Sequence, residues 1–277
     1  MKERTGSKDS NRIDALFHDL RDKGGKALIT FITAGDPDLD ATRDLILEME
    51  RNGADIIELG IPFSDPMADG PTIQASSERA LKKGTTPRDV LKTVKEARER
   101  GSVAPIVLFG YYNPVFRYGL RRFARDAKAA GADGVLVVDL PPEESGELKA
   151  ELDAFGLDLI FLLTPTSDPG RMRLVSARGK GFIYFVSLTG VTGARESLSR
   201  KIPSYVRKVR KYTGLPVGVG FGISTPRQAR EVSLSSDAVI VGSAIINVIS
   251  ENSDDRGRLL REVGSFVKSL KDALRGC

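Results

Sequence analysis

Two carboxylates, Glu58 and Asp69, have the spacing and surroundings of groups that could move protons. They lie in ADIIELGIPFSDPMADGPTIQ (54–74). Glu58 interrupts an apolar run typical of a buried strand, where an unpaired charge is costly. Asp69 follows in a loop rich in Gly and Pro. Because burial raises the pKa of a carboxyl group toward neutrality, such groups suit general acid–base catalysis.

The elements that would hold these groups are short β-branched runs, most of them apolar on both faces. That pattern indicates parallel strands covered by helices. Amphipathic segments separate the runs, such as 40–55, which ends at Asn52–Gly53, and 123–133, where Gly131 is the predicted stop. The eight predicted strands are 26–35, 54–62, 104–111, 134–141, 158–165, 181–188, 216–222 and 237–246.

The alternation predicts an α/β fold, a (β/α)₈ TIM barrel formed by residues 1–277 as a single domain. An extra N-terminal helix at about 10–22 and an inserted helix at 73–83, after the second strand, complete it. The alternative is a doubly wound open sheet. It is less favoured, because no Gly-rich dinucleotide fingerprint follows the first strand.

The bulk properties narrow the function classes. Of 277 residues, 40% are hydrophobic and 29% charged, typical of a soluble globular protein. The net charge is +5, but the basic residues are dispersed, and the runs at 117–128 and 207–212 suit solvated helix faces better than a nucleic-acid site. The single Cys, Cys277, favours a reducing compartment. The polar start lacks a signal peptide's apolar region, and the longest apolar stretch, 238–246, is too short to span a bilayer. We therefore expect a cytoplasmic protein.

Active sites of such barrels form at the C-terminal ends of the strands. Glu58 is in phase with Ile56 and opposite Ile57 and Leu59, so one set faces the barrel interior and the other the helices. A carboxylate near the top of the interior can reach water or substrate, which is less costly than burial against helices. The alternative is an ion-paired or capped core residue.

Other polar residues near strand ends leave two interpretations open. Asp69 and Asp65 could simply build turns, as Asp before Gly or Pro often does. Tyr184, on a face with Phe182 and Val186, could be a core or a site residue. Asp139, before a Pro–Pro pair, is better explained by a structural or supporting part.

Glycine-rich loops after strands six, seven and eight suggest a phosphorylated ligand. The loop after strand six is LTGVTGAR (188–195). After strand seven, GFGISTPRQAR (220–230) places Gly222 before the N-cap candidates Ser224 and Thr225. VGSAII (241–246) places Gly242 and Ser243 after strand eight. Backbone N–H groups at helix starts bind anions, and the last two loops are the usual phosphate site of this fold.

Absent residue types restrict the reaction. The single His, His18, lies in the N-terminal helix, so no metal site is expected. No Lys occupies the C-terminal end of a predicted strand, which disfavours Schiff-base chemistry. The reaction class that remains is acid–base catalysis by carboxylates on a phosphate ester.

These motifs resemble one family over nearly the whole chain. ELGIPFSDPMADGPTIQ, FITAGDPD (31–38), GVTGAR (190–195), GFGIS (220–224) and VGSAI (241–245) are similar to the tryptophan synthase α subunit. The resemblance implies a lyase that cleaves indole-3-glycerol phosphate into indole and glyceraldehyde 3-phosphate, without a cofactor of its own. It also implies a pyridoxal-phosphate β subunit as partner, in an α2β2 heterotetramer, and neither nucleic-acid nor membrane partners.

By motif position, the resemblance makes Glu58 the catalytic acid/base, Asp69 the second carboxylate and Tyr184 a tyrosine that positions Glu58. It implies loops around Pro66, Asn113 and Pro114 that face the β subunit. It further implies a phosphate site of Gly193, Gly222, Gly242 and Ser243, an indole slot of Phe31, Phe109, Leu136 and Phe221, and a retained loop residue, Thr192.

Two departures and two rivals stay open. Phe182 stands where the family often has Tyr, and SLTG (187–190) varies, which affects expectations about loop closure. One rival is another phosphate-binding barrel, such as a phosphoribosyl isomerase or indole-glycerol-phosphate synthase, although the latter should show a strand-end Lys. The other is a non-catalytic partner, which would not need a costly buried acid.

Overall fold

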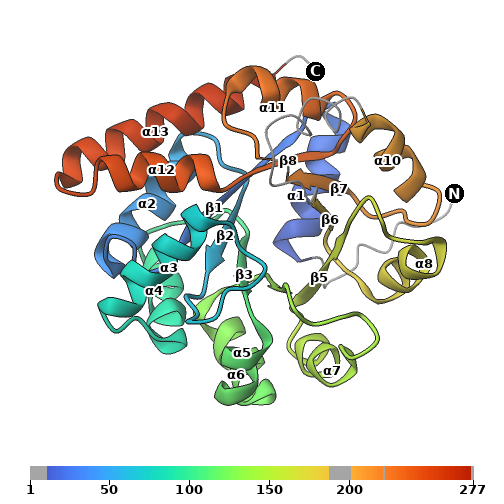
Figure 1. The fold of residues 1–277 in the computed structure, drawn as a ribbon, viewed down its shortest axis with the longest axis horizontal. Coiled ribbons are helices and arrows are strands. Elements are labelled where there is room, and N and C mark those ends of the chain that lie inside the picture. Colours follow the sequence, from blue (N-terminus) through green and yellow to red (C-terminus); the bar gives the residue numbers. More distant parts are fainter. Residues whose placement is uncertain (1–10, 187–200, 221, 276–277) are drawn as a thin grey trace, which may run out of the picture.

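Eight parallel strands close into a barrel in a computed structural model that describes residues 11–186, 201–220 and 222–275. Each strand pairs with the next, and β8 returns to pair with β1 (Figure 1). The predicted (β/α)₈ barrel is confirmed, and the open sheet is excluded. The strands are β1 Ala27–Thr33, β2 Ile56–Gly60, β3 Ile106–Gly110, β4 Gly134–Val137, β5 Asp158–Leu163, β6 Ile183–Val186, β7 Val217–Gly220 and β8 Ala238–Val241.

Helices surround the barrel, and the two additional helices expected from the sequence are present as α1 and α3 (Figure 1). The described helices are α1 Arg12–Asp22, α2 Leu39–Arg51, α3 Pro71–Lys82, α4 Pro87–Glu99, α5 Tyr112–Tyr118, α6 Leu120–Ala130, α7 Gly146–Ala154, α8 Pro169–Arg178, α10 Ile202–Val209, α11 Pro226–Ser233, α12 Ser243–Glu251 and α13 Arg256–Ala273. The predicted stops hold: Asn52 caps α2, and Gly131, at φ 97°, caps α6.

The strands separate two apolar layers, which explains why they are hydrophobic on both faces. Ile57 and Leu59 belong to the outer layer between the barrel and the helices. Ile56 belongs to the inner cluster. The alternation inferred along β2 is therefore confirmed, and Glu58 shares the inward phase.

Helix α1 closes the N-terminal end of the barrel. Its Ile13 and Phe17 are buried in the inner cluster. The Phe17 ring lies 6.0 Å from that of Phe182, centroid to centroid. A Cβ on Gly134 would come within 3.2 Å of the Ile13 side chain, so the absence of one lets α1 approach. Phe182 thus serves the closed end, which accounts for an apolar ring at this position.

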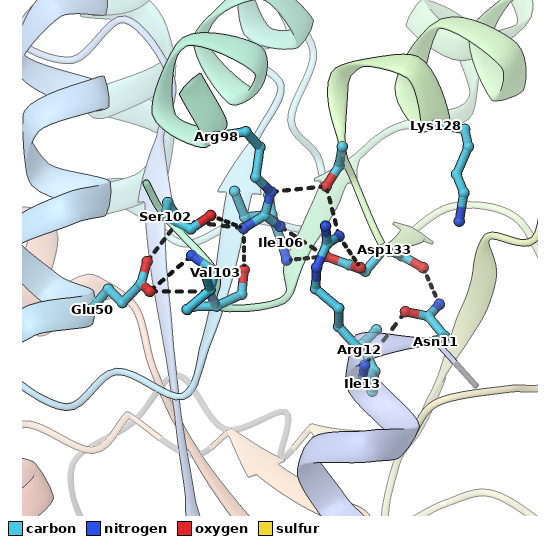
Figure 2. A network of polar contacts seen from close by, with 12 residues as sticks. Asn11, Arg12, Ile13, Glu50, Arg98, Ser102, Val103, Ile106, Lys128 and Asp133 are labelled. Carbon is cyan, nitrogen blue, oxygen red and sulfur yellow. Dashed lines mark hydrogen bonds and ion pairs between the residues drawn. The ribbon is translucent and has the colours of Figure 1, made fainter. Parts of the chain in front are cut away.

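A polar network around Asp133 secures the same end (Figure 2). The two carboxylate oxygens lie 2.8 Å from Arg12 Nη1 and 2.9 Å from Arg98 Nη2. The Ile106 N–H also donates to Asp133. Arg98 donates further to the Gly131, Ser102 and Ala104 carbonyls. The network joins α1, α4 and the starts of β3 and β4.

Two boundaries differ from the sequence-based expectation. The run 237–246 is not all strand: β8 ends at Val241 and helix α12 begins at Ser243. Apolar residues continue because Ile245 and Ile246 are the buried face of that helix. The basic run 117–128 spans two helices, α5 and α6, which are separated at Gly119 with φ 92°.

Candidate active site

A cavity of about 800 Å³ opens at the C-terminal ends of the strands. It is where the barrel rule places an active site. Among its described lining residues, Asp69 is the one with a formal charge. The lining consists of Phe31, Ala68, Asp69, Gly70, Pro71, Thr72, Ile73, Phe109, Tyr184, Val186, Gly220, Gly222, Ile223, Ser224, Ile240, Gly242, Ser243, Ala244 and Asn247.

Glu58 lies inside the barrel beside Phe31, its register partner on β1. The residue is 0% exposed, and neither carboxylate oxygen has a hydrogen-bond partner within the described part of the chain. Burial raises its pKa from 4.5 to about 8. The interior placement is confirmed, whereas the expected access to water is wrong for this conformation. Within the described residues, no ion pair or cap accounts for the burial of this carboxyl group, which disfavours the alternative of an ion-paired core residue.

Asp69 lies at the rim, on the loop between β2 and α3. The Tyr111 hydroxyl donates to its Oδ2 over 3.0 Å. The Asp69 N–H also donates to the Pro66 carbonyl, so the residue builds a turn and presents a carboxylate to the cavity at once. Burial raises the pKa of Asp69, and the Tyr111 hydrogen bond opposes that rise.

Tyr184 reaches the cavity from β6. Its ring lies against Gly220, where a Cβ would be 2.6 Å from the hydroxyl oxygen, so the close approach requires glycine. The Phe109 ring is 6.4 Å away, centroid to centroid. Burial raises the pKa of Tyr184 well above its ordinary value, and the negative charges of Glu58 and Asp69 add to the rise. At neutral pH the hydroxyl therefore stays protonated and can donate a hydrogen bond.

The loops after β7 and β8 also reach the cavity, and helix α12, which follows β8, packs against α3, the helix that follows the Asp69 loop. Gly222, Gly242 and Ser243 all line the cavity. Gly222 has φ 48°, and Ser243 is the first residue of α12. The first N–H groups of a helix have no intrahelical acceptor, which makes such a start a ready anion site.

The remaining predicted site residues fall into three groups. Phe31 and Phe109 line the cavity in edge-to-face contact, with centroids 5.1 Å apart. Leu136 faces the interior but lies in the inner cluster, fully buried and not in the cavity wall. Gly193, Thr192 and Phe221, with the variable 187–190 segment, lie outside the described residues.

Two residues that hold the elements around the site, Tyr111 and Asp36, were not identified from the sequence. Tyr111 follows β3 directly, and a polar aromatic residue at a strand's C-terminal end could have signalled it. Asp36, in the FITAGDPD motif, is 2% exposed and accepts hydrogen bonds from Ser76 Oγ at 2.6 Å and from Arg79 Nε at 2.8 Å. It anchors α3, the helix that follows the Asp69 loop.

Asp139 and Asp65 do not line the cavity. Asp139 accepts the Tyr112 N–H at 2.7 Å and so fixes the start of α5, a structural part as expected. Asp65 is exposed and accepts from Ser64 Oγ. Across the described residues, no cluster of His, Cys, Asp and Glu could hold a metal ion. Within the same ranges, no helix is long and apolar enough to cross a membrane.

Burial of Glu58 predicts a pH-dependent stability. Between its ordinary pKa of 4.5 and the folded-state pKa of about 8, the folded chain keeps a proton that the unfolded chain has lost. The free energy of unfolding should therefore fall as pH rises through this window, by up to about 1.4 kcal/mol per pH unit. Glu58→Gln should remove that dependence and become increasingly stabilising from pH 5 to 8.

Urea unfolding of both chains at pH 5, 6, 7 and 8 measures the effect. Glu144→Gln is the matched control, because Glu144 is exposed on the β4–α7 loop. Curves for wild type and Glu58→Gln that stay a constant distance apart would contradict the raised pKa.

A parallel barrel with a buried, protonated acid near a cavity, and with the start of helix α12 in the cavity wall, defines a (β/α)₈-barrel enzyme suited to acid–base chemistry on an anionic ligand. Comparison with known proteins narrows this class. The tryptophan synthase alpha chain family model matches residues 17–275. The chain therefore belongs to the tryptophan synthase alpha chain family.

Individual relatives agree with that assignment. The tryptophan synthase alpha chain of Geobacter sulfurreducens is 56% identical over 264 residues, 95% of this chain and 99% of the relative. Tryptophan synthase subunit alpha from Legionella pneumophila str. Paris has a similar crystal structure, with a TM-score of 0.90 at 39% identity, covering 97% of this chain and 100% of that one. A Mycobacterium tuberculosis tryptophan synthase in an open form is 34% identical, with a TM-score of 0.86 over 96% of this chain and 99% of that one.

Proposed function

We propose that this chain is a lyase that cleaves indole-3-glycerol phosphate into indole and glyceraldehyde 3-phosphate for tryptophan synthesis. The family assignment supports the reaction. The observation that carries the mechanism is Glu58, a fully buried carboxyl group with a pKa of about 8 below the cavity floor. At neutral pH it carries a proton, so it is ready to act first as an acid.

The residues divide the reaction between them. Glu58, after turning into the cavity, donates its proton to C3 of the indole ring. It then takes the proton of the C3′ hydroxyl as the C3–C3′ bond breaks, so the electron pair returns to the ring and the hydroxyl carbon becomes the aldehyde. Asp69 accepts a hydrogen bond from the indole N–H and stabilises the positive charge that develops on the ring.

The remaining site residues hold the two ends of the substrate. Tyr184 positions the Glu58 carboxyl group. Phe31 and Phe109 enclose the indole from the cavity wall. The resemblance adds Phe221, which lies outside the described residues. The phosphate binds to backbone N–H groups at Gly222, Gly242 and Ser243. The resemblance adds Gly193 as a phosphate contact and Thr192 as a loop residue, and both lie outside the described residues.

The partner is a tryptophan synthase β subunit, in an α2β2 assembly in the cytoplasm. It holds the pyridoxal phosphate and receives the indole, while this chain uses no cofactor. Two exposed apolar side chains support a docking face: Met67 is 84% exposed and Phe116 is 56% exposed. They adjoin Pro66 and Asn113–Pro114, the loops expected at the interface.

Incubation of the purified chain with indole-3-glycerol phosphate tests the function. We expect slow release of free indole, detected optically, and faster release when a β subunit is added. The chain contains no Trp, so the optical background is low. A chain that consumes no indole-3-glycerol phosphate, alone or with a β subunit, would refute the proposal.

A further inference from the structure

Tyr111 connects the third strand to the loop that carries Asp69. It follows β3, is the N-cap residue of α5 and is 3% exposed. Its hydroxyl accepts the Ala68 N–H at 2.9 Å and donates to Asp69 Oδ2 at 3.0 Å. Its ring packs against Phe63 with centroids 5.2 Å apart. One buried side chain therefore holds the backbone and the carboxylate of the loop together.

The contacts of Asp69 divide between its backbone and its side chain. Its N–H donates to the Pro66 carbonyl at 3.0 Å, and its carbonyl accepts from Gln74 Nε2 at 2.8 Å. Within the described ranges, Tyr111 is the residue whose hydrogen bond reaches the carboxylate. A backbone fixed at both ends still leaves the side chain free to rotate. The Tyr111 hydroxyl removes that freedom by engaging one of the two oxygens.

The ionisation of both groups suits this arrangement. Burial and the charges of Asp69 and Asp139 raise the pKa of Tyr111, so its hydroxyl stays protonated and remains a donor. Burial raises the pKa of Asp69, and the donated hydrogen bond opposes the rise. Among the described residues, Tyr184 also senses the charge of this carboxylate, together with that of Glu58. Glu58 is mostly protonated at neutral pH, and Tyr184 is neutral, so neither replaces Tyr111 in stabilising the Asp69 anion.

We propose that Tyr111 is a positioning residue that engages Asp69 Oδ2 so that the other oxygen faces the indole N–H of the substrate. The inference rests on the proposed function, because it assigns the indole ring to Asp69. Tyr111 itself contacts neither the indole ring nor the phosphate of the substrate. Its effect reaches the reaction only through the orientation and ionisation of the Asp69 carboxylate.

Tyr111→Phe tests the role, because it removes the hydroxyl and keeps the ring against Phe63. We expect kcat for indole release to fall about tenfold at neutral pH, with a smaller loss at higher pH. The sign follows from Asp69, which works as an anion: without its donor its pKa rises, so a larger fraction is protonated and inactive at low pH. Tyr112→Phe is the matched control, since that ring packs on Phe116 of α5 with centroids 5.7 Å apart.

Binding measurements separate positioning from folding and from catalysis. Indole-3-propyl phosphate keeps the indole N–H and the phosphate but lacks the C3′ hydroxyl, so it binds without being cleaved. Tyr111→Phe should bind it about fivefold more weakly, while binding of glycerol 3-phosphate stays unchanged. In the Asp69→Asn background, Tyr111→Phe should have little further effect, because the two residues act as one unit.

The outcomes are distinct. Equal rates, pH profiles and analogue binding in wild type and Tyr111→Phe overturn the role of Tyr111 and leave the proposed function intact. Effects of Tyr111→Phe and Asp69→Asn that simply add overturn it too, since Tyr111 would then act elsewhere. A wild-type chain that neither cleaves the substrate nor binds the analogue overturns the proposed function, and the Tyr111 role fails with it.

Discussion

Glu58→Gln is expected to reduce indole release on the order of a thousandfold, while the affinity for glycerol 3-phosphate is retained. An amide of nearly the same size can neither donate a proton to C3 of the indole nor take one from the hydroxyl. Glu58 is fully buried and is not among the residues that line the cavity, whereas Gly222, Gly242 and Ser243 of the loops after β7 and β8 are. Steady-state rates with optical detection of indole, together with calorimetric binding of glycerol 3-phosphate, measure the two effects separately.

Glu144→Gln again supplies the control, because it makes the same chemical change at an exposed position. It should keep the wild-type rate. Turnover by Glu58→Gln within a few-fold of wild type would remove Glu58 from the mechanism and leave its burial without a functional explanation.

Asp133→Asn is expected to lower the free energy of unfolding by about 3–5 kcal/mol. The side chain of Asp133 is 3% exposed and that of Arg98 is 12% exposed, so the substitution leaves a largely buried guanidinium without its carboxylate. It also weakens the acceptor of the Ile106 N–H. Denaturant unfolding at pH 7 measures the loss.

The ion pair between Asp19 and Lys23 offers a comparison, because both side chains are more than half exposed. Asp19→Asn should cost less than about 1 kcal/mol. Since Asp133 precedes β4 and the cavity lies at the other ends of the strands, folded Asp133→Asn should keep its kcat. A loss of activity without a loss of stability would contradict a purely structural part.

Local periodicity was enough to predict the barrel and the inward direction of Glu58. Alternation along a strand has a period of two, so Ile56 and Glu58 had to share a face whatever the neighbouring strands did. The helix ends at Asn52 and Gly131 were predictable for the same reason, since they depend on chain-local stereochemistry.

Depth inside the barrel was not predictable, because it depends on register between strands. Leu136 and Phe109 are register partners on β4 and β3, yet Leu136 is fully buried in the inner cluster while Phe109 lines the cavity. Glu58 faces inward as predicted but is closed off from water. The alternation along a strand predicts whether a side chain faces the barrel interior or the helices. Whether an inward side chain reaches the cavity depends on how the side chains of the other strands pack around it.

Polar contacts between residues far apart in the sequence could not be predicted either. Tyr111 and Asp69 are 42 residues apart, and Arg12 and Asp133 are 121 apart. Each pair meets only because the barrel brings distant strand ends together. The resemblance supplied Asp69, but no local pattern indicated which hydroxyl would hold it.

Helix α1, whose Ile13 and Phe17 fill the N-terminal end of the barrel, restricts how substrate can enter and product can leave. Because the N-terminal end of the barrel is filled, substrate and product both pass through the cavity opening at the C-terminal ends of the strands. A protein bound over this opening could then take up the released indole before it diffuses into bulk water. Escape of the product would depend on how well the two surfaces seal, and the chemistry beneath would not need to change.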